Sequence, residues 1–256
     1  MKNKQDYEPK YKHLKTRFDK LDSITTDQNK GVPLPPMEKP YKETDTIIEL
    51  PKPNREIVKV NDIFTCLNDR RSRRKYTETP ITLDELSYLL WFTQGIKRIF
   101  KRDEYYSVAI RTVPSAGARN PLETYLVVNN VEELEQGVYR YLPITHQLLR
   151  VEEHNCTEEN LMAAINNQEF VVKAPVIFMW AALPYRTEWR YATEAEKLVL
   201  LDAGHVCQNL YIAAESLRLG VCAIAAYVQE EADRVFNLDG EDEFILYLAS
   251  VGNHKK

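Results

Sequence analysis

The chain has 256 residues, of which 44% are hydrophobic and 28% are charged. This length and composition allow a sizeable core, and we expect one globular domain preceded by an extension. The net charge of −4 at pH 7 argues against a general nucleic-acid binder, which needs a broad basic surface. The longest apolar run, residues 174–183, is too short to span a bilayer, and the first ten residues lack the apolar core of a secretory signal. We therefore expect a cytoplasmic protein that binds neither nucleic acid nor membrane.

The N-terminal residues 1–55 are rich in lysine, aspartate, threonine and proline, with scattered aromatic residues. The aromatic residues favour an extended arm that lies on the surface of the domain, and a disordered tail is the alternative. We therefore divide the chain into an arm, residues 1–55, and a domain, residues 56–256.

Regular structure is expected from about residue 60. Helical spacing of apolar residues predicts helices over residues 63–67 and 85–93, and Gly95 is expected to end the second one. The basic and aromatic residues 97–106 predict a loop or a short helix. Residues 111–121 contain two prolines and a glycine, which predict an irregular loop.

Several later segments are rich in β-branched and aromatic residues, and we expect each of them to form a strand. These segments are residues 124–128, 137–141, 148–151, 176–182 and 244–251. A modest helix is expected over residues 160–166. Strands separated by helices of differing length, with one hairpin-like pair, predict an α+β architecture in which helices pack on a mixed sheet.

A long apolar helix is expected from residue 194 onwards. Thr193 and Glu196 have capping-box spacing, and apolar residues recur at steps of three and four as far as Leu217. Because further apolar residues fill much of the remaining circumference, we expect a helix that is buried nearly all round. About 22 helical residues span roughly 33 Å, so a sheet, other helices or a second subunit must cover the helix.

The end of this helix is expected at a glycine. Gly220 follows the last periodic residue, where a left-handed conformation commonly ends a helix. Residues 221–227 then predict an interior strand.

The four cysteines, Cys66, Cys156, Cys207 and Cys222, show neither Cys-x-x-Cys nor Cys/His metal spacing. We therefore expect free thiols and no metal site.

A basic cluster, Arg70-Arg71-Ser72-Arg73-Arg74, is the first candidate binding segment. Guanidinium groups match phosphate oxygens bidentately, so a cluster anchored to a folded core can hold a phosphorylated cofactor. The alternative is a solvated basic turn. A localisation signal or nucleic-acid patch fits the acidic net charge less well.

A second candidate is the loop with Pro114, Ser115, Ala116 and Gly117. Its small side chains let backbone N–H groups approach a flat ligand closely, although a tight connector has the same composition.

A third candidate is the run Ala223, Ile224, Ala225 and Ala226. Three of these four side chains are too small to keep a planar ring away, and the alternative is a tightly packed strand.

The chain contains no Gly-x-Gly-x-x-Gly run and no phosphate-binding Gly-x-x-x-x-Gly-Lys-Ser/Thr run. A Rossmann nicotinamide domain and a P-loop are therefore not expected. Neither a Gly-x-Ser-x-Gly elbow nor a His-Glu-x-x-His zinc helix occurs, which argues against hydrolysis by those routes.

Taken in order, these segments resemble the nitroreductase superfamily, and within it the SagB-type dehydrogenases related to thiazoline and oxazoline oxidases. The segments that carry the resemblance are residues 70–76, 83–95, 111–119, 137–141, 201–205, 220–222 and 251–252. The resemblance implies a three-layer fold with a mixed, mainly antiparallel central sheet flanked by helices. It also implies an intertwined homodimer with the long helix at its interface.

The resemblance further implies an FMN-dependent oxidoreductase. Arg70, Arg71, Ser72 and Arg74 would hold the phosphate and ribityl chain of FMN. The loop Pro114 to Gly117 of the partner subunit would lie by the flavin ring, which residues 223–226 would line. Hydride would pass from NAD(P)H or an organic substrate to a small acceptor, and a nicotinamide that stacks on a flavin needs no Rossmann domain.

Azoline oxidases of this type carry a Lys-Tyr pair thought to transfer protons, and the corresponding residues here are Arg190 and Tyr191. Arginine stays protonated and is a poor general base, so Tyr191 is the candidate acid. Many relatives bind phosphate with basic residues beyond the last strand, and Lys255 is the candidate here. The alternatives are a SagB-type azoline dehydrogenase acting on a peptide-derived substrate, a non-redox flavin-binding or scaffold protein, and an unrelated interaction domain.

Overall fold

The computed structural model describes residues 15–21, 23–101 and 107–255. Its main sheet has seven strands in the order β1-β6-β5-β4-β7-β9-β8, and each neighbouring pair is antiparallel. These strands are β1 (Ile47–Glu49), β4 (Leu122–Val128), β5 (Gly137–Leu142), β6 (Gln147–Arg150), β7 (Val176–Ala182), β8 (Leu219–Ile224) and β9 (Phe244–Asn253). The prediction of an α+β fold with a mainly antiparallel sheet is confirmed. The parallel pairings in the described ranges are isolated bridges, such as the one between Ser72 and Val221.

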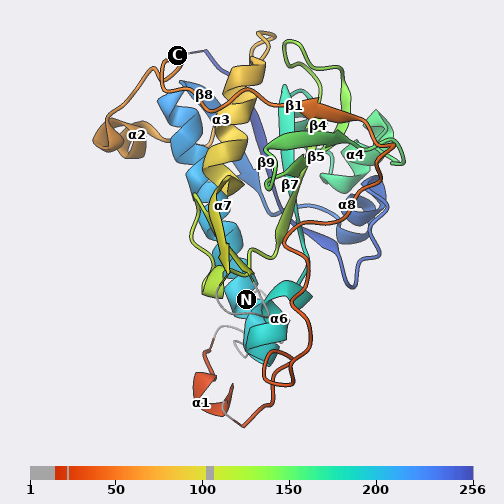
Figure 1. Cartoon of the computed structure of the whole chain (residues 1–256). Helices are drawn as coiled ribbons and strands as arrows, with labels where there is room; N and C mark the ends of the chain where they lie inside the picture. The colour runs from red at the N-terminus through yellow and green to blue at the C-terminus, as the bar shows by residue number, and fades with distance from the viewer. Residues whose placement is uncertain (1–14, 22, 102–106, 256) are drawn as a thin grey trace, which may run out of the picture.

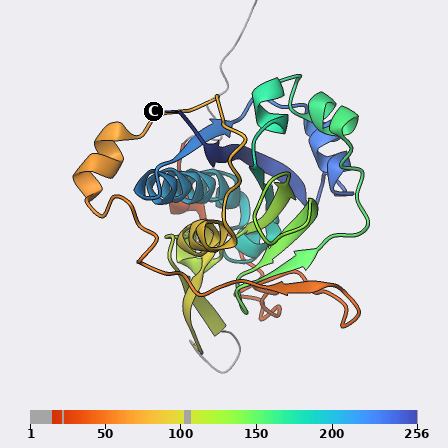
Figure 2. The same ribbon diagram turned by 90° about the horizontal axis from the view of Figure 1, so that it is seen from above.

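Helices cover both faces of this sheet (Figure 1). The helices are α1 (Phe18–Leu21), α2 (Ile63–Asp69), α3 (Leu83–Gln94), α4 (Glu158–Ala164), α5 (Glu169–Val172), α6 (Tyr185–Tyr191), α7 (Ala195–Ser216) and α8 (Gln229–Val235). One core contains side chains of α3 and α7 with Leu126 and Phe178 of the sheet, whereas the other contains side chains of α4 and α8 with Val127 and Ile177. Neighbouring residues of a strand point to opposite faces, so each central strand contributes to both cores. The result is three layers, with α3 and α7 side by side in one outer layer (Figure 2).

The start of α3 is fixed by a capping box. The Thr82 hydroxyl accepts a hydrogen bond from the Glu85 N–H (3.1 Å), and the Glu85 carboxylate accepts one from the Thr82 N–H (3.2 Å). The helix predicted over residues 85–93 is therefore confirmed and is slightly longer. The helix predicted from Ile63 is confirmed as α2.

The capping box predicted at the start of α7 was wrong. A short 3-10 turn, Ala192–Glu194, precedes α7, and the N-cap residue is Glu194, which makes no side-chain capping bond. The chain enters α7 almost directly from α6, so no extended residue is in place to cap it. Instead, the Glu194 carboxylate accepts a hydrogen bond from the Arg17 N–H (3.0 Å).

The predicted role of Gly220 was also wrong. Helix α7 ends at Ser216, and Arg218 takes the left-handed conformation with a φ of 57°. Gly220 instead lies within β8, where a Cβ atom would come within 3.0 Å of both Arg73 Cβ and His254 Cδ2. The glycine is therefore needed for a close approach of side chains and not for a turn.

Helix α7 is not buried all round within a single chain. Its buried side contains residues such as Val199, Ala203 and Val206, but Leu200 and Leu201 are 52% and 50% exposed. The exposed apolar side chains leave one side of the helix open to a further partner.

A hairpin connects α3 to the loop that follows it. Strand β2 (Ile96–Lys101) pairs with β3 (Ser107–Arg111), so the prediction of a loop or short helix was wrong for residues 97–101. Residues 102–106 lie outside the described ranges. Every residue from Lys97 to Lys101 is exposed, so β2 has no buried face and no alternation that would reveal a strand. The loop predicted over residues 111–121 begins one residue later than expected, since Arg111 ends β3, and is otherwise irregular apart from a 3-10 turn at Ala116–Ala118.

All four cysteines are free. Within the described ranges, no group of His, Cys, Asp and Glu side chains could hold a metal ion, and no helix is long and apolar enough to cross a membrane.

The described part of the N-terminal segment lies against the domain (Figure 1). The Trp189 indole N–H donates to the Val32 carbonyl (2.8 Å), and the Arg140 guanidinium donates to the carbonyls of Lys39 (2.9 Å) and Pro40 (3.1 Å). Strand β1 then joins the sheet beside β6. The division of the chain at residue 55 stays a prediction, although these contacts make residues 32–49 part of the packed structure.

A buried charge cluster lies between this segment and the sheet. Glu123, which is 2% exposed, accepts hydrogen bonds from the Arg186 guanidinium and from the Lys39 N–H (3.0 Å). Its second oxygen lies 3.7 Å from the Arg140 guanidinium. One carboxylate therefore neutralises part of the charge of two buried arginines.

We expect Glu123→Gln to lower the free energy of unfolding by about 3–5 kcal/mol, because it leaves Arg140 and Arg186 buried without a carboxylate. Urea unfolding followed by circular dichroism measures this change. The control is Glu152→Gln, which removes an exposed partner of Arg150 and is expected to cost less than about 1 kcal/mol. Equal losses in the two variants would contradict the assignment.

Candidate functional site

The arginine cluster lies along the free edge of the sheet. The Arg73 N–H donates to the Val221 carbonyl (2.8 Å), and Ser72 forms a parallel bridge with Val221. Strand β8 is the last strand of the sheet, so residues 70–74 run beside its outer edge. The structure therefore brings the first candidate segment next to the strand that leads into the third.

Tyr211 of α7 joins these two segments. Its hydroxyl oxygen accepts a hydrogen bond from the Ala223 N–H (2.9 Å) and lies 3.0 Å from Ser72 Oγ. The guanidinium carbon of Arg70 lies 5.2 Å from the centroid of the Tyr211 ring. Sequence reasoning did not select Tyr211, because one tyrosine in an apolar helix gives no signal of its hydroxyl partners.

Arg74 lies beside the opposite surface of β8. Its guanidinium carbon is 5.8 Å from the centroid of the Phe170 ring. Burial raises the pKa of the Cys222 thiol, and Arg74 partly offsets this effect by its charge and a hydrogen bond. A buried thiol with a raised pKa is a packing residue and not a nucleophile.

The basic segment has no acidic partner. Within the described ranges, none of Arg70, Arg71, Arg73, Arg74 and Lys75 forms an ion pair. A run of uncompensated cations fixed beside a strand produces a local positive potential that favours an anionic ligand.

The third candidate segment, residues 223–226, belongs to the sheet only in its first two residues. Strand β8 ends at Ile224, so the strand predicted as far as residue 227 is shorter than expected. Ala223 is half-buried, whereas Ala225 and Ala226 are exposed. Small exposed side chains just after the strand that borders the basic segment leave room for a flat ligand.

The loop of Pro114 to Gly117 is held by Asp202 of α7. The Ser115 hydroxyl donates to one carboxylate oxygen (2.5 Å), and the Ala116 N–H donates to the other (3.1 Å). Burial raises the pKa of Asp202, and the two hydrogen bonds oppose that shift. Asp202 lies in a segment that carried the family resemblance, yet no pattern marked it as the anchor of this loop.

The same loop lies against the two candidate catalytic residues. Gly117 has a φ of 56°, and a Cβ atom there would lie 2.6 Å from the Tyr191 hydroxyl and 3.3 Å from Arg190 Cδ. The Arg190 guanidinium carbon is 5.4 Å from the centroid of the Tyr191 ring, and the ring of Phe18 lies edge-on to it at 6.0 Å. A residue with a side chain at position 117 would therefore displace Tyr191.

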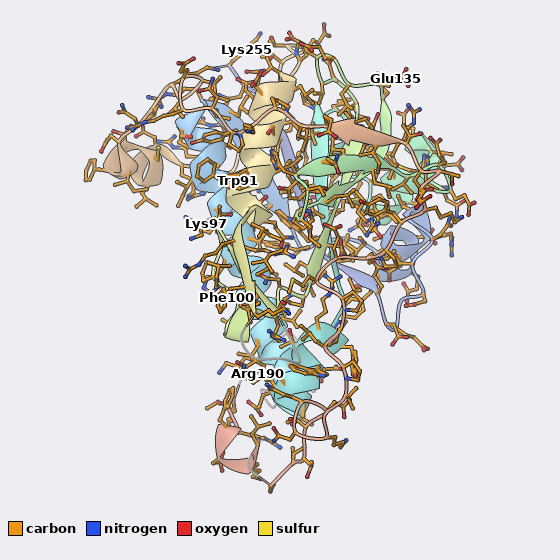
Figure 3. The ribbon with its side chains drawn as sticks, in the orientation of Figure 1. Trp91, Lys97, Phe100, Glu135, Arg190 and Lys255 are labelled. Carbon is orange, nitrogen blue, oxygen red and sulfur yellow. The ribbon has the colours of Figure 1, made fainter. Side chains whose placement is uncertain are left out.

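These residues form two groups within one chain. Asp202 and Tyr211 are nine residues apart on α7, which corresponds to about 14 Å along the helix. Figure 3 shows Arg190 and Lys255 towards opposite ends of the molecule. The first group contains residues 70–74, residues 223–226 and the C-terminal residues, and the second contains the Pro114 to Gly117 loop with Arg190 and Tyr191.

Lys255 lies with the first group. It is exposed, and its carbonyl accepts a hydrogen bond from His254 Nδ1 (2.9 Å). The His254 ring in turn packs over Gly220 next to Arg73.

Comparison with known proteins relates this arrangement to one family. The model of the nitroreductase family matches residues 67–253. MJ1384 of Methanocaldococcus jannaschii, a nitroreductase by name, is 36% identical over 205 residues, which are 80% of this chain and 96% of that protein. The trifolitoxin operon protein TfxC of Rhizobium leguminosarum is 24% identical over a match that covers 85% of this chain and 62% of TfxC. The microcin B17-processing protein McbC of Escherichia coli is 25% identical over a match that covers 50% of this chain and 49% of McbC.

Solved structures show the same fold. A nitroreductase from Anabaena variabilis has a TM-score of 0.70 at 22% identity, and the match covers 94% of this chain and 45% of the Anabaena chain. A chain of the E. coli microcin synthetase McbBCD, solved with truncated pro-MccB17, has a TM-score of 0.58 at 18% identity. The match covers 86% of this chain and 79% of that chain. A nitroreductase from Desulfovibrio desulfuricans in complex with FMN has a TM-score of 0.51 at 16% identity. The match covers 77% of this chain and 88% of that chain.

The match of the family model to residues 67–253, the similarity to MJ1384 and the fold agree on the family. The chain belongs to the nitroreductase family.

Proposed function

We propose that the protein is an FMN-dependent oxidoreductase that works as a homodimer. The observation that carries this proposal is the uncompensated basic segment, residues 70–74, fixed beside a strand that ends in exposed alanines. A flavin phosphate needs cations and a flavin ring needs a flat surface, and both lie on one edge of the sheet. The structure of a family member in complex with FMN supports this choice of cofactor.

The residues present fit FMN. Arg70, Ser72 and Arg74 would hold its phosphate and ribityl chain, with Arg71 and Lys255 adding positive charge. Residues 223–226 would lie along the ring. Bound FMN supplies hydride transfer, and the surrounding residues bind it, orient it and exclude water.

The second group of residues reaches such a site from a second copy of the chain. The Pro114 to Gly117 loop is anchored about 14 Å along α7 from Tyr211, so it does not complete the first group within one chain. Leu200 and Leu201 are exposed on α7, and Phe64 of α2 is 75% exposed. These apolar side chains support a homodimer interface that includes α7.

NAD(P)H or an organic substrate would act as donor, and a small molecule such as a quinone or nitroaromatic would act as acceptor. The nicotinamide would bind at the flavin itself.

A second candidate is oxidation of a peptide-derived azoline ring. Relatives named for microcin processing and for the trifolitoxin operon favour it. Arg190 and Tyr191, which correspond in sequence to the Lys-Tyr pair of azoline oxidases, lie together against Gly117. Because Arg190 remains protonated, Tyr191 would carry the proton, and Arg190 would contribute only its positive charge.

We expect the purified protein to be yellow and to contain FMN, because the basic segment has no counter-charge among the residues that the structure describes. It should oxidise NADH or NADPH with a quinone or nitroaromatic acceptor faster than free FMN does. The absorption spectrum and its bleaching by each nicotinamide test both statements. A colourless protein that does not bind added FMN would refute the proposal, and bound FMN without turnover would favour a non-redox scaffold.

We expect Arg70→Ala to weaken FMN binding by about 1.5–3 kcal/mol, the contribution of a hydrogen bond to a charged group. Fluorescence titration of the flavin-free protein measures the affinity. The matched control is Lys75→Ala, which removes an exposed cation from the same segment and should change the affinity far less. Unchanged affinity in Arg70→Ala would show that this guanidinium does not touch the cofactor.

A further inference from the structure

Part of the N-terminal arm lies across α6, the short helix that ends at Tyr191 (Figure 1). We call the described residues between 17 and 32 the strap. The Trp189 carbonyl of α6 accepts a hydrogen bond from the Gln28 N–H (2.9 Å), and the Trp189 indole N–H donates to the Val32 carbonyl (2.8 Å). The strap therefore holds Trp189 both by its backbone and by its side chain.

The strap also holds the chain on the other side of Tyr191. The Arg17 N–H donates to the Glu194 carboxylate (3.0 Å), which is buried in the turn between α6 and α7. The ring of Phe18 lies edge-on to the Tyr191 ring, with the two centroids 6.0 Å apart. Tyr191 is thus bracketed along the chain by Trp189 and Glu194, and the strap contacts its ring directly.

The residue after Tyr191 has an unfavourable backbone conformation. Ala192 has a φ of 44° and a ψ of −124°, which a residue with a Cβ atom rarely adopts. Such a conformation persists only where the surrounding contacts fix it, and these positions cluster at functional sites. Helix α6 has seven residues and no side-chain cap at its start, so it is too short to be stable alone. Contacts from outside the helix must therefore hold this junction.

The strap supplies such contacts from outside the part of the chain that matches the family. The family model matches residues 67–253, so every residue of the strap precedes it. The match to MJ1384 covers 96% of that protein but only 80% of this chain. The strap is therefore an addition to the matched domain, and it packs on the helix that carries the candidate acid.

We propose that the strap is a positioning device for Tyr191 and that Phe18 is its main contact residue. The Tyr191 hydroxyl lies 2.6 Å from the place that a Cβ atom on Gly117 would take, so a small rotation of α6 would change its approach to this loop. Because the strap fixes the chain on both sides of Tyr191, it keeps the hydroxyl at the loop. The use of this hydroxyl rests on the proposed function, in which Tyr191 is the candidate proton donor.

Hydrogen–deuterium exchange of the flavin-free protein tests the strap without catalysis. We expect Phe18→Ala to speed exchange of the amides of residues 185–194 at least about tenfold, because the junction opens more often. The matched control is Tyr41→Ala, which removes a ring of similar exposure from the same arm, 43% against 42% for Phe18. It should leave this exchange within about twofold. Equal exchange in the wild type and in Phe18→Ala would overturn the proposal.

Kinetics with a quinone acceptor test whether this positioning serves the reaction. In each turnover NADH and one proton convert the quinone into hydroquinone and NAD+. We expect Phe18→Ala to lower kcat at least about fivefold, because a displaced proton donor transfers its proton less well. Phe18→Tyr, which keeps the ring, should retain most of kcat. In a Tyr191→Phe background, Phe18→Ala should cause no further loss, because no hydroxyl is left to position.

Two kinetic outcomes would overturn the proposal. An equal loss on Phe18→Ala with and without the Tyr191 hydroxyl would mean that the strap acts elsewhere. A higher kcat in Phe18→Ala would mean that the arm obstructs Tyr191 and does not position it.

The two readouts also separate this proposal from the proposed function. If the wild type binds no FMN and shows no turnover, the proposed function fails, and exchange still decides whether the strap holds α6. If FMN and turnover are present but Phe18→Ala changes neither exchange nor kcat, the function stands and the strap proposal fails.

Discussion

The positions of both halves of the candidate site depend on two polar side chains of α7. Tyr211 ties residue 72 to strand β8 through its hydroxyl, and Asp202 ties the Pro114 to Gly117 loop through its carboxylate. Because a helix is stiff, the rise of α7 fixes the separation of these anchors at about 14 Å. A single chain therefore holds the two groups of candidate residues apart, and in the proposed homodimer a second copy would bring complementary groups together.

Most of the fold could be predicted from local patterns. Strand β7 is buried at every residue and appears as a continuous apolar run, and the helical spacing of apolar residues over 85–93 predicts α3. The extent of α7, Ala195–Ser216, agrees with the predicted helix to within about a residue at each end. Its caps could not be predicted, since Thr193 and Gly220 have the chemistry of caps but lie in a 3-10 turn and a strand. Strands β1 and β2 were missed because one is very short and the other has no buried face.

The candidate site could be predicted only in part. Arginine clusters and small-residue runs are visible in a sequence, and the structure places residues 72 and 73 beside β8, the strand that leads into residues 223–226. Tyr211 and Asp202 act through partners far away in the chain, which a single sequence cannot reveal. Arg73 and His254 both approach Gly220 closely, and the missing side chain of this glycine has a meaning only when its neighbours are known.

The central claim is that each flavin site combines residues of two chains, and subunit complementation tests it most directly. Arg70→Glu disables the first half-site and Gly117→Val the second, so neither homodimer should hold FMN. After unfolding and refolding of an equal mixture, half of the dimers are mixed, and each has one intact site, so about a quarter of all sites should recover FMN. No recovery, with both variants folded and exchanging subunits, would mean that both halves belong to one chain and would contradict the account.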